Sequence, residues 1–319
     1  MVSVQERRFL LRKLNKSETE ISGQHYAYQL SPFDADLANV STYLSQAILL
    51  EVAAYPKPGL VTRLDNGSHT DMSLMTFMMS SAVLGKAFHC LQQMGMEHQG
   101  DLKELFEKIR AYGILAEREL LSVTKGVNTQ RGILFAGGVI CAAAGFALRS
   151  GMGKESLIPV IKKMTSGLVE NELLRIRRDS VTAGEKLFSR FGITGIRGEV
   201  EKGFPSVLEQ GLPALQEAFK RGAPLNDALV HGLLSLMTVV EDSNVVWRCG
   251  ISALAEVRQT ASDIIKKGSV FTAEGRAAVG LAADSFKKQR VSPGGSADLL
   301  SVAIGFYLLD KKEFPTDIF

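Results

Sequence analysis

Apolar residues recur through most of this 319-residue chain at the three- and four-residue spacing of helix faces. In one such stretch Leu37, Val40, Tyr43 and Leu44 fall on a single face, and Glu51 lies on the same face further along. Sustained alternation of apolar and polar residues, which is typical of strands, is hard to find. The pattern therefore predicts an all-α protein.

We expect about ten or more helices packed as one compact domain, joined by short connections that carry Gly or Pro. The predicted helices cover residues 34–54, 72–95, 101–122, 129–149, 154–174, 178–191, 206–221, 224–241, 244–268, 274–290 and 295–310. The longest uncharged run, residues 132–148, is shorter than the ~20 residues that span a bilayer and is rich in Gly and Ala. This run predicts a buried central helix.

Two segments do not fit the helical pattern. Residues 1–30 are polar and weakly periodic, which predicts a partly ordered N-terminal arm and leaves residues 31–319 as the helical domain. Residues 192–205 are too rich in Gly for a regular element, so we expect an ordered loop there. The length allows one large domain or two smaller ones, but no linker favours two.

The composition is that of a globular protein, with 45% hydrophobic and 22% charged residues and a formal net charge of +3. This charge is too small to argue for a nucleic-acid or membrane partner, and the basic residues are not interleaved with stacking aromatics. The three cysteines lie far apart without CxxC or His spacing, which argues against a disulfide framework or a structural zinc. The N-terminus has no apolar h-region, so we expect a cytoplasmic protein.

Four short polar segments interrupt the helical pattern: residues 55–71, 124–132, 242–248 and 292–298. Together they combine turn formers with hydroxyl and amide side chains, carboxylates and basic residues. Amides at helix N-termini attract anions, Gly lets the backbone approach a ligand closely, and carboxylates hold Mg²⁺ against phosphate oxygens. The segments therefore predict one shared site for phosphates and a divalent cation, with four ordinary helix caps as the alternative.

Standard nucleotide and hydrolase signatures are absent. Residues 151–156 (GMGKES) look like a phosphate loop, but the first Gly of GxxxxGK[ST] is missing and Glu155 stands in place of the hydroxyl residue. No GxSxG, HExxH or dinucleotide fingerprint is visible. Hydride transfer and serine hydrolase chemistry therefore lose their usual support.

At the polar segments the chain resembles the triphosphoribosyl-dephospho-CoA synthases, the CitG and MdcB type proteins. The resemblance covers roughly residues 37–309 and rests on PKPGLV, GSHTDM, GVNT, TGIRGE with GFP, DSN and SPGGSADLL, in the family's order. It implies a transferase that takes ATP and 3'-dephospho-CoA, expels adenine and joins the triphosphoribosyl group to a hydroxyl of the CoA ribose. The product would be the precursor of the prosthetic group of citrate lyase or malonate decarboxylase, passed on to an acyl carrier protein holo-transferase, and a homodimer stays open.

The resemblance also implies roles for individual residues. Loss of adenine passes through an oxocarbenium-like state, which needs a nearby carboxylate, a proton for the leaving base and activation of the incoming hydroxyl. The expected catalytic residues are Glu51, His69, Asp71 and Asp242, and the expected Mg²⁺ ligands are Glu51, Asp65 and Asp71. The expected substrate-binding residues are Lys57, Pro58, Gly59, Ser68, Asn128, Thr129, Gln130, Arg131, Arg197, Glu199, Asn244, Arg248, Ser292, Gly294, Gly295 and Asp298.

Some of these residues also fit structural roles. The resemblance implies that Ser292, Gly294, Gly295 and Asp298 form a helix-capping loop for the CoA diphosphate. His69 could instead stabilise a turn, and Asp298 could cap its own helix rather than contact the ligand. The family commonly has His-Lys after GVNT, whereas this chain has Gln130 and Arg131, and a glutamine side chain cannot exchange a proton at neutral pH. Two alternatives stay open: a hydrolase that cuts the ATP N-glycosidic bond with water, and a non-catalytic nucleotide-binding protein.

Overall fold

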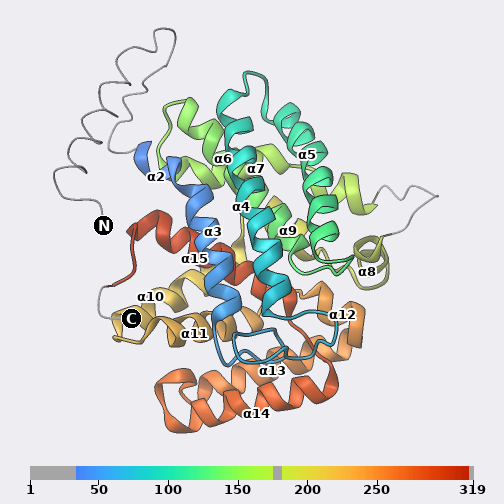
Figure 1. Ribbon diagram of the computed structural model, residues 1–319, viewed down its shortest axis with the longest axis vertical. Coiled ribbons are helices and arrows are strands. Elements are labelled where there is room, and N and C mark those ends of the chain that lie inside the picture. Colours follow the sequence, from blue (N-terminus) through green and yellow to red (C-terminus); the bar gives the residue numbers. More distant parts are fainter. Residues whose placement is uncertain (1–33, 175–181, 316–319) are drawn as a thin grey trace, which may run out of the picture. The chain divides into compact units, whose positions relative to one another are not determined.

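Helices and the turns between them make up the part of the chain that the structure, a computed structural model, describes: residues 34–174 and 182–315 (Figure 1). No strand occurs in these residues, so the all-α prediction is confirmed. The predicted arm at residues 1–30 lies outside them. All described residues belong to one compact unit, Pro32–Phe319.

The helices follow the predicted ranges closely over most of the chain. They are α2 (Asp34–Ala38), α3 (Val40–Ala53), α4 (Leu74–Glu97), α5 (Leu102–Val123), α6 (Arg131–Arg149), α7 (Leu157–Thr165), α8 (Ala183–Phe191), α9 (Gly195–Glu201), α10 (Leu212–Lys220), α11 (Leu225–Met237), α12 (Ser243–Cys249), α13 (Ile251–Lys266), α14 (Ala273–Gln289) and α15 (Gly294–Lys311). Short helical turns link some of them: η1 (Lys154–Ser156), η2 (Glu170–Leu174), η3 (Val207–Gly211) and η4 (Ser269–Phe271).

Some sequence-based expectations about regular structure were wrong. The single helices expected at residues 34–54 and 154–174 are interrupted at residue 39 and at residues 166–167. The Gly-rich stretch 192–205 contains the short helix α9, because Val200 and Phe204 are fully buried and this burial outweighs the low helix propensity of its glycines. The single helix expected at residues 244–268 is broken at Gly250, whose φ of 89° lies outside the range that most residues adopt. The break separates α12, which reaches the cavity described below, from α13.

The centre of the protein is a close crossing of α4 and α6. A Cβ on Gly95 of α4 would lie 2.1 Å from the carbonyl oxygen of Ala142, and a Cβ on Gly145 of α6 would lie 2.0 Å from that of Gln92. Only glycine at both positions lets the backbones approach this closely. Nearly all of α6 is buried, as predicted for the central helix.

Two described helices, α4 and α6, are long and apolar enough to cross a membrane by length and composition alone. Most of the apolar part of α6 is covered by other parts of the protein. Burial of this kind is what a core helix requires, so the apolar composition of α6 is explained by its packing.

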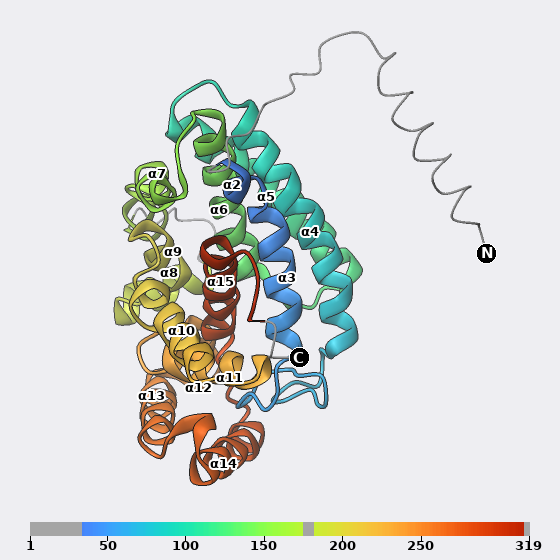
Figure 2. The same ribbon diagram turned by 90° about the vertical axis from the view of Figure 1, so that its left-hand side faces the viewer.

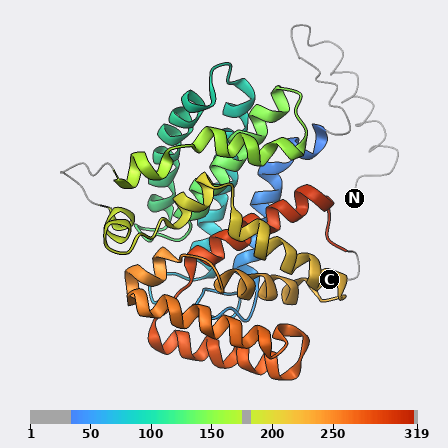
Figure 3. The same cartoon turned by 180° about the vertical axis from the view of Figure 1, so that it is seen from behind.

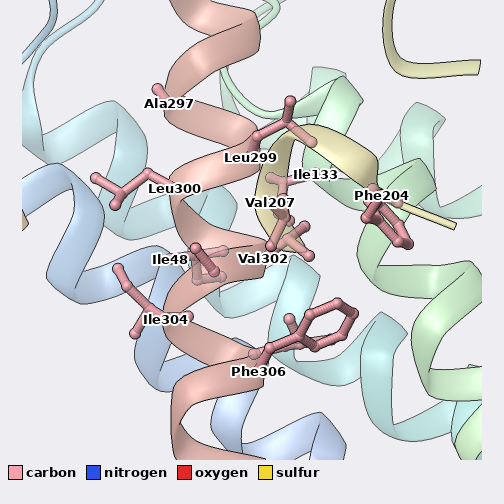
Figure 4. Packing of buried hydrophobic residues seen from close by; sticks show 14 of the residues in the cluster. Ile48, Ile133, Phe204, Val207, Ala297, Leu299, Leu300, Val302, Ile304 and Phe306 are labelled. Carbon is pink, nitrogen blue, oxygen red and sulfur yellow. The ribbon is translucent and has the colours of Figure 1, made fainter. Parts of the chain in front are cut away.

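The last long helix, α15, is buried along most of its length (Figure 4). It packs against α3 on one side and against α10 and η3 on others (Figure 2). Phe306 of α15 meets Phe204 edge to face, with ring centroids 5.8 Å apart. Because α15 is fixed on several sides, its first turn is held firmly in place at the cavity. The helices α13 and α14 pack against each other (Figure 3).

Candidate functional site

One large cavity, with a volume of about 730 Å³, opens where the starts of α6, α12 and α15 meet the loop that follows α3. Residues from all four polar segments line it, and α5, α8 and α9 contribute the remaining walls. The helix ends that the sequence marked with Gly, Pro and polar residues therefore converge in space.

Most of the predicted site residues line this cavity: Glu51, Lys57, His69, Asp71, Asn128, Thr129, Gln130, Arg131, Arg197, Glu199, Asn244, Arg248, Ser292, Gly294, Gly295 and Asp298. Pro58, Ser68 and Asp242 do not. Gly59 and Asp65 line a separate cavity of about 180 Å³ instead. The structure therefore does not bring Asp65 together with Glu51 and Asp71, and the Asp65 carboxylate accepts a hydrogen bond from the Gly67 N–H at 2.8 Å.

The loop after α3 is anchored to the C-terminal end of α14. The Ser68 hydroxyl lies 2.6 Å from the carbonyl oxygen of Val291 and 3.0 Å from that of Phe286. A Cβ on Gly59, which has a φ of 73°, would lie 2.0 Å from the Val291 oxygen. Ser68 and Gly59 therefore hold the loop in place, and this contact explains why the structure puts them outside the cavity.

Lys57 and Glu51 form a buried ion pair at the inner end of the cavity. The Lys57 ammonium donates to the Glu51 carboxylate and to the Glu51 carbonyl oxygen, the latter at 2.7 Å. Their side chains are 1% and 6% exposed. Burial lowers the pKa of Lys57, and the neighbouring Glu51 opposes this shift. Each charge is therefore compensated mainly by the other.

His69 bridges the loop after α3 and the start of α15. Its Nε2 lies 2.8 Å from Ser292 Oγ, and its Nδ1 lies 3.3 Å from Arg248 Nη1 and 3.6 Å from Asp71 Oδ1. A guanidinium can only donate, so the Arg248 contact needs a lone pair on Nδ1, whereas the contact with the Asp71 carboxylate needs a proton there. Burial, and then the Arg248 charge, lower the pKa of His69, which agrees with a neutral ring at pH 7.

The Asp242 carboxylate accepts hydrogen bonds from the first turns of two helices, α12 and α15. Its Oδ1 accepts from the N–H groups of Asn244 and Val245 in α12, at 3.1 and 3.3 Å. Its Oδ2 accepts from the Ser296 N–H of α15 at 2.8 Å and from the Ser296 hydroxyl at 3.1 Å. The side chain is buried, and burial raises its pKa while the N–H groups of Ser296, Gly295 and Val245 lower it. The carboxylate thus fills the anion position at the N-terminus of α15 that had been expected to receive the CoA diphosphate.

Asp298 joins the start of α15 to the start of α6. It lies inside α15 and interacts with the backbone N–H of Ile133, so the expectation that it caps its own helix was wrong. Its Oδ2 packs so tightly on Gly132 that a Cβ there would lie 1.9 Å away. Burial, together with the charges of Glu51 and Asp242, raises the pKa of Asp298 well above its ordinary value.

Gln130 and Thr129, which directly precede α6, differ in whether their polar side-chain atoms have hydrogen-bond partners. The carbonyl oxygen of Gln130 accepts from Ser80 Oγ and lies 3.4 Å from Ser81 Oγ, so this end of the amide is held by α4. The buried hydroxyl of Thr129 has no hydrogen-bond partner among the described residues. Because buried polar groups normally have partners, the Thr129 hydroxyl is a candidate contact for a ligand in the cavity.

The outer end of the cavity carries residues that the sequence reasoning missed. Arg110 and Glu117 line it from the middle of α5, and Lys202 follows α9. Arg131 Nε lies 2.8 Å from Glu117 Oε1. The one available signal was the seven-residue spacing that puts Arg110 and Glu117 on the same face of α5.

The sequence pattern of one protein family, described as ATP:dephospho-CoA triphosphoribosyl transferase (CitG), matches residues 37–316. The chain belongs to the CitG family. The match includes every element that lines the cavity, so the family's sequence features and the cavity coincide.

Individual members of the CitG family are similar to this chain over most of their length. A probable 2-(5''-triphosphoribosyl)-3'-dephosphocoenzyme-A synthase of Malonomonas rubra is 40% identical over 88% of this chain and 90% of its own. The 2-(5''-triphosphoribosyl)-3'-dephosphocoenzyme-A synthase of Pectobacterium atrosepticum is 37% identical over 88% and 91%. No solved structure matches the chain.

Gly132 offers a test of the close contact with Asp298. We expect Gly132→Ala to lower the free energy of unfolding by about 1–3 kcal/mol, because the added methyl group overpacks this contact, and to slow turnover with it. Gly113→Ala in α5 is the matched control, since its Cβ would meet no described atom within 4 Å. The control should stabilise the protein by about 0.5–1 kcal/mol in urea unfolding. Equal effects of the two variants would contradict the contact.

Proposed function

We propose that the cavity binds ATP with its ribose at the inner end, where adenine is expelled and a hydroxyl of 3'-dephospho-CoA takes its place. The observation that supports this most is the charge distribution along the cavity. Glu51 is buried and Asp298 lies close to it, which marks the inner end, while Arg110, Arg131 and Arg197 are 39%, 52% and 26% exposed and mark the outer end. A substrate with a developing cation on its ribose and a triphosphate at its other end matches this distribution.

Glu51 and Asp298 suit different tasks in this reaction. The Glu51 carboxylate is held in place by the Lys57 ammonium and lines the cavity, so Glu51 can stabilise the positive charge that develops on the ribose. The pKa of Asp298 is raised by burial and by its acidic neighbours, so Asp298 can carry a proton and deliver it to the departing adenine. A pair of carboxyl groups, one acting as a proton donor and the other facing the developing cation, is the arrangement that glycosidic chemistry uses.

His69 suits a positioning role better than that of a base. We infer that Arg248, the nearer of the two neighbours of Nδ1, sets the tautomer, so that Nδ1 accepts from Arg248 and Nε2–H donates to Ser292. The Ser292 hydroxyl is thereby oriented, with its own proton free to point to a substrate oxygen. We infer that His69 and Ser292 hold one of the reacting riboses and that Asp242 acts only by fixing α12 and α15.

A magnesium ion fits this cavity as part of the nucleotide complex. The described residues include no group of three or more His, Cys, Asp or Glu side chains that could hold an ion by themselves. Mg²⁺ commonly binds through one or two carboxylates together with substrate phosphates. Asp71 lines the cavity with a half-exposed carboxylate, and would be such a ligand. The ion would neutralise phosphate charge.

We infer that the protein works in the cytoplasm, where ATP and 3'-dephospho-CoA are available. Its product would pass to an acyl carrier protein holo-transferase, and the final recipient would be a citrate lyase or a malonate decarboxylase. The 40% identity to the Malonomonas rubra relative extends over nearly the whole chain and supports the shared reaction in either pathway.

The deciding experiment incubates the purified protein with ATP, Mg²⁺ and 3'-dephospho-CoA and follows the products by mass spectrometry. We expect free adenine together with triphosphoribosylated dephospho-CoA. Adenine with ribose triphosphate would favour the hydrolase instead. ATP binding without any adenine would favour the non-catalytic nucleotide-binding protein, and both results would contradict the proposal.

The same assay tests the metal ligand. We expect Asp71→Asn to raise the Mg²⁺ concentration needed for half-maximal turnover by at least about tenfold, because one of its few protein ligands is lost. Asp65→Asn is the matched control, since Asp65 lies in the same loop but lines the separate cavity. If both variants need the same Mg²⁺ concentration as the unchanged protein, Asp71 is not a ligand.

A further inference from the structure

The carboxylate of Glu172, in η2, joins two arginines that come from different helices. Its Oε1 accepts from Arg110 Nη2 of α5 at 2.7 Å, and its Oε2 accepts from Arg197 Nε of α9 at 2.7 Å. The exposed fractions are 39% for Arg110, 26% for Arg197 and 24% for Glu172. Each oxygen of a single carboxylate therefore fixes one guanidinium group.

Further contacts restrict both arginines. The guanidinium of Arg110 lies over the ring of Phe135, 5.1 Å from the ring centroid. Arg197 Nη1 packs on Gly184, where a Cβ would lie 2.8 Å away. A planar guanidinium that is stacked and hydrogen-bonded has already lost most of its rotational freedom, so it binds a ligand at a smaller entropic cost.

The two arginines face the cavity, whereas Glu172 does not. Arg110 and Arg197 line the cavity near Arg131 and Lys202, and Glu172 is not among the lining residues. A guanidinium has five N–H donors, and Glu172 accepts only one from each arginine. Most of the donors on both groups are therefore left for a ligand, and that ligand must be anionic.

The start of α8 borders this anion-binding subsite. Thr182, Ala183 and Gly184 line the cavity on the side where Arg197 packs. The Glu185 carboxylate accepts from the Thr182 N–H, and the Thr182 hydroxyl accepts from the Glu185 N–H, so a capping box closes this helix start. The attraction for an anion therefore comes from the arginines.

We propose that Arg110 and Arg197, held by Glu172, bind the terminal phosphates of ATP. The proposal rests on the function proposed above, because the ribose must lie at the carboxylate end for the triphosphate to reach the arginines. Two guanidinium groups on either side of one carboxylate can contact oxygens of adjacent phosphates. The subsite therefore favours a triphosphate over shorter chains, and Glu172 is a positioning residue.

Binding of inorganic tripolyphosphate to the full chain, measured by calorimetry at fixed ionic strength, tests the arginines directly. We expect Arg110→Gln and Arg197→Gln each to weaken tripolyphosphate binding by at least about tenfold and pyrophosphate binding by less. Arg118→Gln is the control, because Arg118 is an exposed residue of the same helix and does not line the cavity. If the control weakens binding as much as the other two, the attraction is general and the subsite is overturned.

Glu172→Gln tests the positioning role. We expect it to weaken tripolyphosphate binding and to raise KM for ATP several-fold without lowering kcat or weakening adenosine binding, because only the arginine geometry is lost. Tighter binding of tripolyphosphate by Glu172→Gln would mean that Glu172 competes with phosphate for the arginines, which would overturn the positioning role.

The two proposals fail in different ways. Tripolyphosphate binding that depends on Arg110 and Arg197, without any adenine release from ATP, would leave the subsite standing and refute the transferase reaction. Adenine release with an unchanged KM for ATP in Arg110→Gln and Arg197→Gln would refute the subsite and leave the transferase reaction standing.

Discussion

Lys57→Met is expected to lower the free energy of unfolding by about 3–5 kcal/mol, because it leaves the Glu51 carboxylate buried without its partner. The neutral, isosteric Met keeps the apolar stem of the side chain in place, so the loss reports the charge. Urea unfolding followed by far-UV circular dichroism measures this difference. Turnover would also fall, since both residues line the cavity, and it is not the informative readout.

Two further variants separate the buried charge from the mere loss of a lysine. Lys86→Met removes a lysine that pairs with Glu119 on the surface, with exposed fractions of 61% and 47%, and should cost at most about 1 kcal/mol. Lys57→Met combined with Glu51→Gln removes both charges and should recover more than half of the loss. If the double variant is as unstable as the single one, the buried pair is not the cause.

Asp242→Asn is expected to destabilise the protein by about 3 kcal/mol or more and to reduce turnover by at least about a hundredfold. An asparagine keeps the shape but turns an NH₂ group toward donors of α12 or α15, so buried N–H groups lose their acceptor. Both helix starts then shift, and with them Arg248 and Asp298. Urea unfolding and the adenine assay, run on the same preparations, measure the two effects.

The relation between the two losses distinguishes a cap from a proton donor. If Asp242 acts only by fixing helices, activity falls in step with stability and no pH at which the protein is folded restores it. Asp101→Asn, which alters the exposed cap of α5 alone, should change stability less and leave turnover unchanged. A stable but inactive Asp242→Asn protein would return Asp242 to the set of proton-transfer candidates.

Periodicity predicted most helices because their stability comes from burying one apolar face, and that face is written in the local sequence. The break at Gly250 and the helix α9 were missed for the opposite reason. At Gly250 a single backbone conformation interrupts a continuous apolar pattern, and in α9 the burial of Val200 overrides a Gly-rich sequence. Both depend on tertiary contacts.

The candidate site was predictable where its residues mark helix ends. Segments such as SPGGSAD carry turn formers and polar residues together, and these converge on one cavity. Asp242 has its partner Ser296 on another helix, far along the sequence. Asp298 likewise has its partner Ile133 at the start of α6. Neither partner could be predicted from the local sequence. Arg110 had only its seven-residue spacing to Glu117 as a mark, and an arginine in the middle of a helix usually faces solvent.

The arginine subsite at the outer end of the cavity has a kinetic consequence. The triphosphate is not cleaved in this reaction, so Arg110 and Arg197 would bind it equally in substrate, transition state and product. Interactions of equal strength in all three states do not lower the barrier to bond breaking. The affinity of the two arginines for the triphosphate would instead set the rate of product release. A variant with a higher affinity at this subsite would have a lower turnover rate at saturating ATP.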